Sequence, residues 1–250
     1  MKLVKDGFYY LLGEMLVKAI PFFLLPYLTR QLPKSEFGLY SELLAYINVA
    51  FIFILLSQDG ALTRYYYRHG KRGTELIVKI AAFNSLFLWG LLLVIAWMFN
   101  NQMLAIGAMI ALSQSFLAVQ LSQRQCRKMA AKYFNIQLVN AISLIIFTIV
   151  ALNYWPPTFY TCGLAVLASN LLAGFYGVIV TEPKKLTPKL TIHRTKLITI
   201  YLFFIGGPLL FHKFSFFAKT YFDRMIMGDE LGYSDLAIYS AAAQVAAVLS

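Results

Sequence analysis

Long apolar stretches separated by short polar segments dominate the sequence. Each stretch is long enough for a helix to cross a bilayer core of about 30 Å, and none shows the strict alternation of barrel strands. Because lipid satisfies no backbone hydrogen bonds, helices are the expected spanning elements. We predict membrane-spanning helices over Phe8–Leu28, Leu39–Gly60, Glu75–Phe99, Met103–Leu121, Tyr133–Leu152, Phe159–Val180 and Leu197–Tyr221, with an eighth beginning near Leu236.

The composition favours an all-α polytopic membrane protein. The 250 residues are 60% hydrophobic and 13% charged, with a mean hydropathy of +0.66. A soluble globular chain is nearer about half apolar and a quarter charged. The first stretch contains Glu14 and no small-residue cleavage site follows it, so a cleaved signal peptide is not expected.

The basic residues gather in alternate polar segments. The third polar segment, around Asn100 and Asn101, and the fifth, "NYWPPTFY", have no Lys or Arg. The N-terminus and the even-numbered segments hold most of the basic residues. This is the positive-inside pattern with a cytoplasmic N-terminus, and it explains the net charge of +11 by contact with membrane lipids, without nucleic acid. The basic residues concerned are Lys2, Lys5, Arg64, Arg68, Lys71, Arg72, Arg124, Arg127, Lys128, Lys132, Lys184, Lys185, Lys189, Arg194 and Lys196.

Motifs of enzymes and metal sites are missing from the sequence. There is no Gly-rich phosphate loop, HExxH, GxSxG or EF-hand-like loop, and the three histidines lack metal-ligand spacing. Cys126 and Cys162 are far apart and fall on opposite sides of the predicted membrane. We therefore do not expect an enzyme, and we expect no cofactor, no metal and no disulfide.

The first apolar stretch carries two charges and two prolines. Counted from Phe8 at 1.5 Å per residue, Lys18 lies about 15 Å deep, near the midplane. Glu14 is one turn earlier on the same face. The two either form a self-neutralising pair that fills the bundle or line a wet cavity for an ionic substrate. Pro21 and Pro26 each remove a backbone hydrogen bond and are expected to bend the helix.

The seventh stretch has a matching interruption at Gly206, Gly207 and Pro208. These residues either form a point where the helix bends or allow close packing against a neighbour. Charged residues follow in the outer half, with Lys219 and Asp223 spaced as an i,i+4 pair that either anchors the helix end or joins a substrate path. Interruptions in the first and seventh helices suggest two repeats of six helices.

Three runs of residues resemble a known family. "PFFLLPYLTRQLPKSEFGLYS" and "DGALTRYYYRHG", together with "KTYFDRMIMGDELGYSDLAIYSAAAQVA", are similar to segments of the lipid-linked oligosaccharide flippases. These O-antigen and capsule repeat-unit flippases form the polysaccharide-transporter branch of the MOP (multidrug/oligosaccharidyl-lipid/polysaccharide) superfamily. The resemblance runs along the whole chain and is most diffuse in the middle helices.

The resemblance implies a fold, a mechanism and a set of site residues. Members have two helical lobes around a central cavity that opens alternately to each side. They move undecaprenyl-pyrophosphate-linked sugars from the cytoplasmic to the periplasmic leaflet of the bacterial inner membrane, for O-antigen, capsule or exopolysaccharide biosynthesis. The cavity residues implied here are Glu14, Lys18, Asp59, Arg64, Lys213, Lys219, Asp223 and Arg224, and the hinge residues are Pro21, Pro26, Gly206, Gly207 and Pro208.

The resemblance also predicts the domains. Residues 1–182 form a six-helix N-terminal lobe, 183–196 a cytoplasmic loop, and 197–250 the seventh helix and the start of the eighth in an incomplete second lobe. We expect a part of a longer protein or a truncated gene product. Proton or sodium coupling and a partner glycan polymerase belong to the same expectation. The alternatives are a MATE-like multidrug or cation antiporter, a membrane-embedded glycan ligase or glycosyltransferase, and an inactive remnant.

Overall fold

Helices make up nearly all of the described chain, and its described residues contain no strand. The computed structural model describes residues 2–69, 74–180 and 192–249, and the side chain of Lys18 lies outside what it describes. The helices are α1 (Lys2–Gln31), α2 (Lys34–Leu55), α3 (Gln58–His69), α4 (Thr74–Met98), α5 (Gln102–Cys126), α6 (Ala130–Tyr154), α7 (Phe159–Ile179), α8 (Ile192–Thr220), α9 (Phe222–Leu231) and α10 (Tyr233–Leu249).

The predicted all-α polytopic membrane architecture is confirmed. In the part of the chain that the structure describes, seven helical stretches are long and apolar enough to cross a membrane. They follow the predicted apolar stretches closely: α4 begins and ends within one residue of the prediction and α7 within one residue at its end. Length and hydropathy decide these elements because a bilayer requires about 20 apolar helical residues per crossing.

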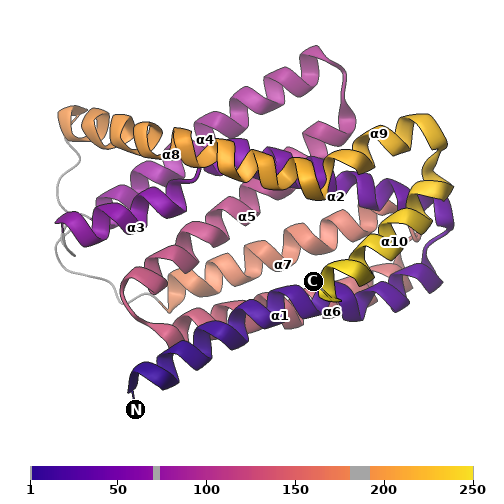
Figure 1. Cartoon of the computed structure of the whole chain (residues 1–250), viewed down its shortest axis with the longest axis horizontal. Helices are drawn as coiled ribbons and strands as arrows, with labels where there is room; N and C mark the ends of the chain where they lie inside the picture. Colours follow the sequence, from indigo (N-terminus) through magenta and orange to yellow (C-terminus); the bar gives the residue numbers. More distant parts are fainter. Residues whose placement is uncertain (1, 70–73, 181–191, 250) are drawn as a thin grey trace.

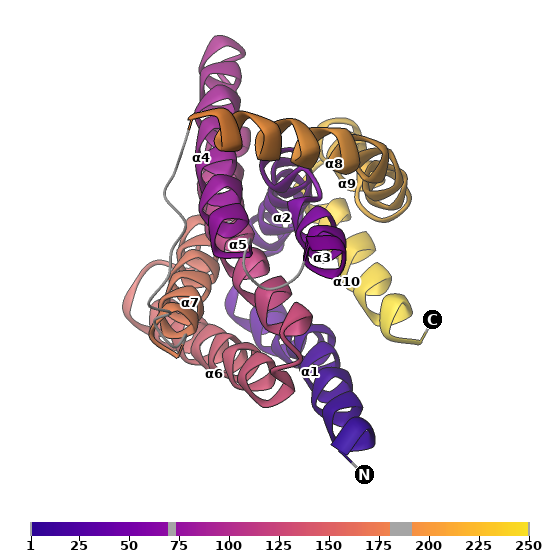
Figure 2. The ribbon, with the colours of Figure 1, turned by 90° about the vertical axis from the view of Figure 1, so that its left-hand side faces the viewer.

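The helices pass back and forth along the long axis of the molecule (Figure 1). The N-terminus, the ends of α3, α5 and α7 and the starts of α6 and α8 all lie at one end, so the basic segments that alternate in the sequence come together there. Viewed along that axis, α8 lies across α4, α2 and α3, while α1 lies beside α6 on the opposite side (Figure 2).

The centre of the bundle is α2, which contacts α4, α5, α7, α8, α9 and α10. Its side chains Leu43, Ile47 and Ile54 are fully buried, as a helix surrounded by other helices requires. Gly107 of α5 lies against the backbone of Tyr46, where an added Cβ would come within 3.1 Å. Close helix contact at small residues is the usual way in which membrane helices pack.

The predicted end of the second helix is wrong. It was expected to stop at Gly60, with Arg64 and Arg68 in a polar loop, but α2 ends at Leu55 and a second helix, α3, continues to His69. The break falls at Leu56 and Ser57, which both adopt positive φ, at 46° and 52°. The segment after the break is helical because Ala61 and Leu62 bury one face against α4, α5 and α8.

Two further expectations about loops need correction. The polar segment before the eighth helix contains a helix of its own, α9, and the eighth helix begins at Tyr233. Arg124, expected in a basic loop, belongs to α5 and is buried. The predicted loop between the lobes, at 183–196, lies largely outside the described residues. The division into lobes therefore stays a prediction.

Candidate substrate-binding site

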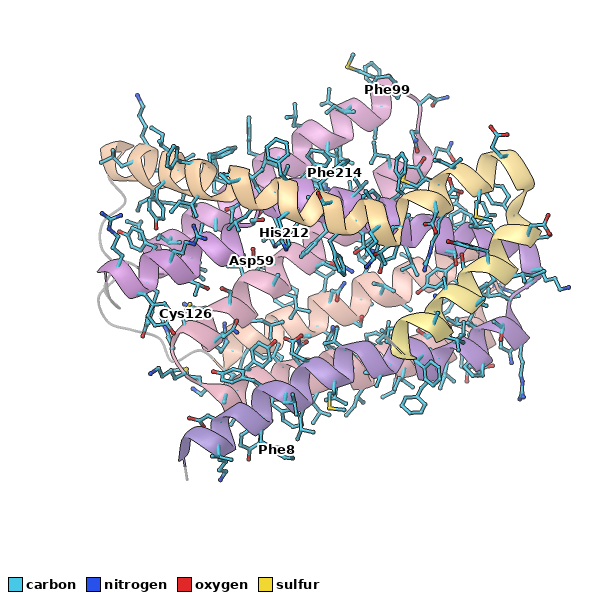
Figure 3. All side chains as sticks on the ribbon, viewed as in Figure 1. Phe8, Asp59, Phe99, Cys126, His212 and Phe214 are labelled. Carbon is cyan, nitrogen blue, oxygen red and sulfur yellow. The ribbon has the colours of Figure 1, made fainter. Side chains whose placement is uncertain are left out.

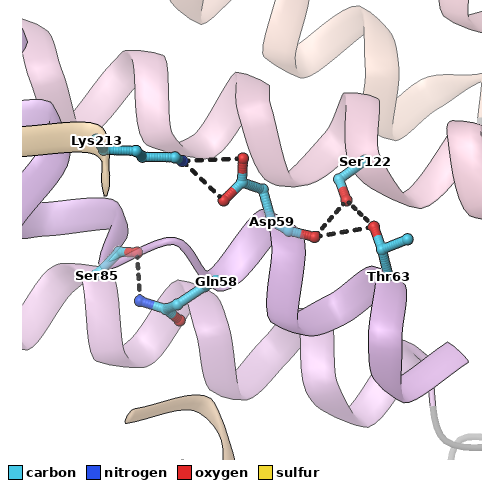
Figure 4. Close-up of polar contacts among 6 residues, drawn as sticks. All are labelled: Gln58, Asp59, Thr63, Ser85, Ser122 and Lys213. Atoms are coloured by element: carbon cyan, nitrogen blue, oxygen red, sulfur yellow. Dashed lines mark hydrogen bonds and ion pairs between the residues drawn. The ribbon is translucent and has the colours of Figure 1, made fainter. Parts of the chain in front are cut away.

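The break between α2 and α3 positions two polar side chains inside the membrane-spanning layer. Positive φ is unfavourable for residues with a side chain, so the conformation of Leu56 and Ser57 must be held by its surroundings. Gln58, which is 1% exposed, donates from Nε2 to Ser85 Oγ of α4 at 3.4 Å (Figure 4). The start of α3 is thereby fixed to α4.

The main chain of Asp59 is fixed to α5. Its carbonyl oxygen accepts hydrogen bonds from Thr63 Oγ1 and from Ser122 Oγ, each at 3.0 Å (Figure 4). The bond from Ser122 joins α3 to α5, because the two residues are 63 positions apart in the sequence. The carboxylate of Asp59 is therefore presented from a rigid backbone.

Helix α8 lies along α3 in antiparallel contact. The rings of Tyr65 and Tyr201 meet edge to face with centroids 5.5 Å apart. Further along, a Cβ on Gly60 would lie 3.2 Å from Leu209, and a Cβ on Gly206 would overlap the carbonyl oxygen of Leu56. Gly206 therefore permits close contact with the break between α2 and α3, as the packing alternative for this residue predicted.

An ion pair joins the two helices beyond this contact. Lys213 Nζ donates to both carboxylate oxygens of Asp59 at 3.1 Å, and it lies 6.0 Å from the centroid of the Phe51 ring. The two side chains are 31% and 34% exposed. Asp59 lies near the middle of the long axis, as does His212, which directly precedes Lys213 in the sequence (Figure 3). Because an unpaired Lys at this depth costs about 2.5–3.5 kcal/mol, the carboxylate is a stabilising neighbour.

Sequence reasoning selected both Asp59 and Lys213 as cavity residues, but did not predict that they pair. The partners are 154 residues apart, and nothing in local spacing connects them. Their partial exposure leaves the ion pair at the surface of the described bundle and not sealed inside it. This is the arrangement from which a membrane protein can bind an anion or exchange a charge.

Glu14 of α1 contacts α6. Its exposed carboxylate accepts a hydrogen bond from the hydroxyl of Tyr133 in α6, and the rings of Tyr133 and Tyr10 meet edge to face at 5.1 Å. The predicted pairing with Lys18 stays untested, since that side chain is not described. Gly13 lets α1 approach α6, because a Cβ there would lie 3.0 Å from the Tyr133 ring.

The charges in the outer half of the seventh span do not form the predicted i,i+4 pair. Helix α8 ends at Thr220, and Tyr221 breaks the helix before α9 begins, so Lys219 and Asp223 do not share one continuous helix. Lys219 is exposed. Asp223 instead accepts a hydrogen bond from the hydroxyl of Tyr239 in α10.

Arg64 and Arg224 lie in contrasting surroundings. Arg64 is exposed on α3, whereas Arg224 is only 5% exposed and its guanidinium lies 5.0 Å from the centroid of the Tyr221 ring. The structure thus brings Asp59 and Lys213 together, whereas Glu14, Asp223 and Arg224 lie in separate contacts.

The predicted hinge residues lie inside unbroken helices. Pro21 and Pro26 are within α1, and Gly206, Gly207 and Pro208 are within α8. Thr29 Oγ1 donates to the carbonyl oxygen of Leu25 at 3.0 Å, which satisfies that acceptor near the helix end. A role for these residues in bending stays a prediction.

Two polar side chains that sequence reasoning left out of the site fix helices to one another. Arg124 donates to the carbonyl oxygens of Gln120, at 2.7 Å, and of Gly177 in α7. Glu36 Oε2 accepts from the backbone N–H of Phe159 at 2.9 Å and so caps the start of α7. Extending the helical phase of α5 by one turn would have placed Arg124 within the bundle.

No group of three or more His, Cys, Asp or Glu side chains that could hold a metal ion occurs in the described part of the chain. Cys126 and Cys162 are both buried with free thiols. The charged chemistry available within the membrane-spanning layer therefore comes from Lys, Arg and carboxylate side chains. These groups suit ionic recognition of a cargo.

The fold and the site define a polytopic α-helical membrane protein with a partly exposed ion pair between two of its spanning segments. Residues 3–250 match the family described as "Polysaccharide biosynthesis protein". The chain belongs to this family of membrane proteins, which is the MOP-type flippase family that the sequence resembles.

Two curated relatives from Haemophilus influenzae are similar along the whole chain. The chain is 34% identical over 251 residues to the "Lsg locus putative protein 1" and 35% identical over 251 residues to an "Uncharacterized membrane protein". Both matches span 100% of this chain, but only 63% and 62% of the length of the two relatives. No solved structure was found to match the chain.

Proposed function

We propose that this protein is a flippase that moves a polysaccharide precursor across the bacterial inner membrane. The precursor is an oligosaccharide linked to undecaprenyl pyrophosphate, and transport runs from the cytoplasmic to the periplasmic leaflet by alternating access between two lobes. In this proposal the N-terminus and the basic end of the bundle face the cytoplasm, in keeping with the positive-inside rule. A proton or sodium gradient drives transport, and a glycan polymerase uses the product.

The Asp59–Lys213 ion pair carries this proposal. A lipid-linked sugar is amphiphilic, and its pyrophosphate must cross a layer that offers it no water. The ammonium of Lys213 is partly exposed inside that layer and can donate charge-assisted hydrogen bonds to phosphate oxygens. Arg64, exposed on the adjoining helix, adds a second cation toward the basic end.

The proposal is tested by reconstituting the protein in liposomes that contain a lipid-linked diphosphate oligosaccharide on one leaflet. Arrival of the sugar on the other leaflet is measured with an impermeant lectin. We expect Lys213→Met to lower the rate at least about tenfold, because a change of about 1.4 kcal/mol at the barrier already has that effect. Lys79→Met, which removes an exposed cation from α4, is the matched control and should leave the rate unchanged.

An equal rate in the Lys213→Met variant would remove this lysine from the path. Uptake of organic cations by the liposomes, without any movement of the glycan, would favour the antiporter alternative and contradict the flippase.

A further inference from the structure

We propose that Asp59 is the residue that selects the charge of the cargo, by competing with it for Lys213. In the resting protein the Asp59 carboxylate is bonded to the Lys213 ammonium. Only a group with at least two negative charges, such as a diphosphate, displaces the carboxylate. This inference rests on the proposed function, and it assigns to Asp59 a positioning and selecting role in place of cargo binding.

The two partners differ in how firmly they are held. The Asp59 backbone is fixed by the hydrogen bond from Ser122, and its short side chain has only two rotatable bonds. Lys213 carries its charge on a four-carbon stem with rotatable bonds. When the pair separates, the ammonium is therefore the group that moves, and the carboxylate remains at the start of α3.

The ion pair is open enough to exchange. About a third of each side chain is exposed, so the ion pair is weaker than a fully buried one. Both carboxylate oxygens bond only Lys213 among the described side chains. The ring of Phe51, 6.0 Å from Nζ, offers the ammonium a favourable surface beside the pair. A solute can thus reach Lys213 without unfolding a helix.

The charge on the competing group decides the outcome. A singly charged phosphate ester or carboxylate resembles Asp59 itself and gains little by replacing it. A diphosphate has a higher charge and more acceptor oxygens, so it binds the ammonium more strongly. A neutral sugar cannot displace Asp59. The acid therefore reduces binding of lipids that lack a diphosphate.

Release of Lys213 also removes the link between α3 and α8. The same interface also has apolar and aromatic contacts, such as Tyr65 with Tyr201. Binding of the correct cargo is thereby coupled to the freedom of α8 to move. The coupling is a population shift, in which the cargo favours the state with a free Lys213.

The experiment measures anion selectivity and helix separation in the same protein. The buried Cys126 and Cys162 are changed to Ala, and spin labels are placed on cysteines at Tyr67 of α3 and Ile200 of α8, both exposed. Inorganic pyrophosphate and dimethyl phosphate, a singly charged phosphate ester, are titrated separately. In the otherwise native protein we expect pyrophosphate to bind at least about tenfold more tightly and to lengthen the distance between the labels.

Asp59→Asn is expected to strengthen binding of both anions, by about tenfold if Lys213 is free a tenth of the time in the native protein. The ratio between the two anions should fall below about threefold, and the labels should be further apart before any anion is added. Asp59→Glu keeps the charge and should keep the selectivity. Asp6→Asn, which neutralises an acid of α1 away from the pair, should change neither quantity.

Unchanged selectivity in Asp59→Asn would overturn the inference, as would a failure of pyrophosphate to bind at all. A protein that moves no lipid-linked glycan in liposomes, but whose pyrophosphate selectivity depends on Asp59, would contradict the proposed function and leave the inference intact. Normal glycan transport with selectivity independent of Asp59 would do the reverse.

Discussion

Helices α1 and α8 share a sequence pattern and differ in what the pattern does. Each is an apolar helix with an internal proline and a charged residue in the membrane-spanning layer. In α1 the carboxylate of Glu14 accepts a hydrogen bond from the hydroxyl of Tyr133. In α8 the charge of Lys213 is neutralised by Asp59. The pattern does not encode the chemistry of the partner side chain. That chemistry makes Glu14 a local contact between α1 and α6, and it makes Lys213 part of an ion pair that we propose can exchange.

Glycines show the same contrast. Gly13 of α1 lies against the ring of Tyr133, a side chain that can rotate, whereas Gly206 of α8 lies against the backbone carbonyl of Leu56. A backbone at a strained break has little freedom to move. The contact of α8 with the α2–α3 break is therefore the less adaptable of the two.

The largest effect is expected for Gly206→Ala. The new Cβ would overlap the Leu56 carbonyl oxygen, so we expect the free energy of unfolding to fall by about 3 kcal/mol, the upper part of the range for overpacking. Gly207→Ala is the matched control, because a Cβ there meets nothing within 4 Å. The control should gain up to about 1 kcal/mol from helix propensity. Unfolding by detergent titration in mixed micelles measures both, and equal losses would show that Gly206 has no special contact.

A smaller loss is expected for Lys213→Met. The change leaves the Asp59 carboxylate without its counter-charge, at a cost of about 2 kcal/mol of unfolding free energy. Adding Asp59→Asn should recover most of that loss, because the uncompensated charge is then removed. A double variant as unstable as the single Lys213→Met variant would mean that Asp59 is solvated by water and not held by the lysine.

The smallest effect is expected for Tyr133→Phe. Loss of the hydroxyl removes the bond to Glu14, but the exposed carboxylate can bond to water instead, so about 1 kcal/mol should be lost. Anion selectivity should not change, since α1 is not part of the Asp59–Lys213 ion pair. Altered anion selectivity in this variant would contradict the functional difference between α1 and α8. Tyr9→Phe, next to Tyr10 on α1, serves as the control for removal of a hydroxyl.

The spanning helices could be predicted because length and hydropathy determine them. The alternation of basic segments likewise predicted which helix ends come together at one end of the bundle. The break at Leu56 and Ser57 could not be predicted, since neither residue is a glycine, proline or asparagine that signals positive φ. Helix α9 was missed because a short, charged helix resembles a polar loop in sequence.

The site was predicted in its residues and not in its pairs. Depth in the membrane selected Lys18 and Lys213, spacing from Lys18 selected Glu14, and the family resemblance selected Asp59. Local spacing favoured partners one turn away, but the described side chains bond across 119 and 154 residues of sequence. Tertiary contacts of this length depend on how the helices are arranged around α2, which periodicity does not specify.

Charge reversal at Asp59 and Lys213 tests the central claim most directly. Asp59→Lys and Lys213→Asp should each lower the free energy of unfolding by about 2 kcal/mol or more, because each places two like charges together in the membrane-spanning layer. Combining them restores opposite charges, and we predict that the double variant regains most of the stability, with a coupling energy of about 2 kcal/mol or more. A double variant that loses the sum of the two single losses would contradict a direct ion pair between α3 and α8.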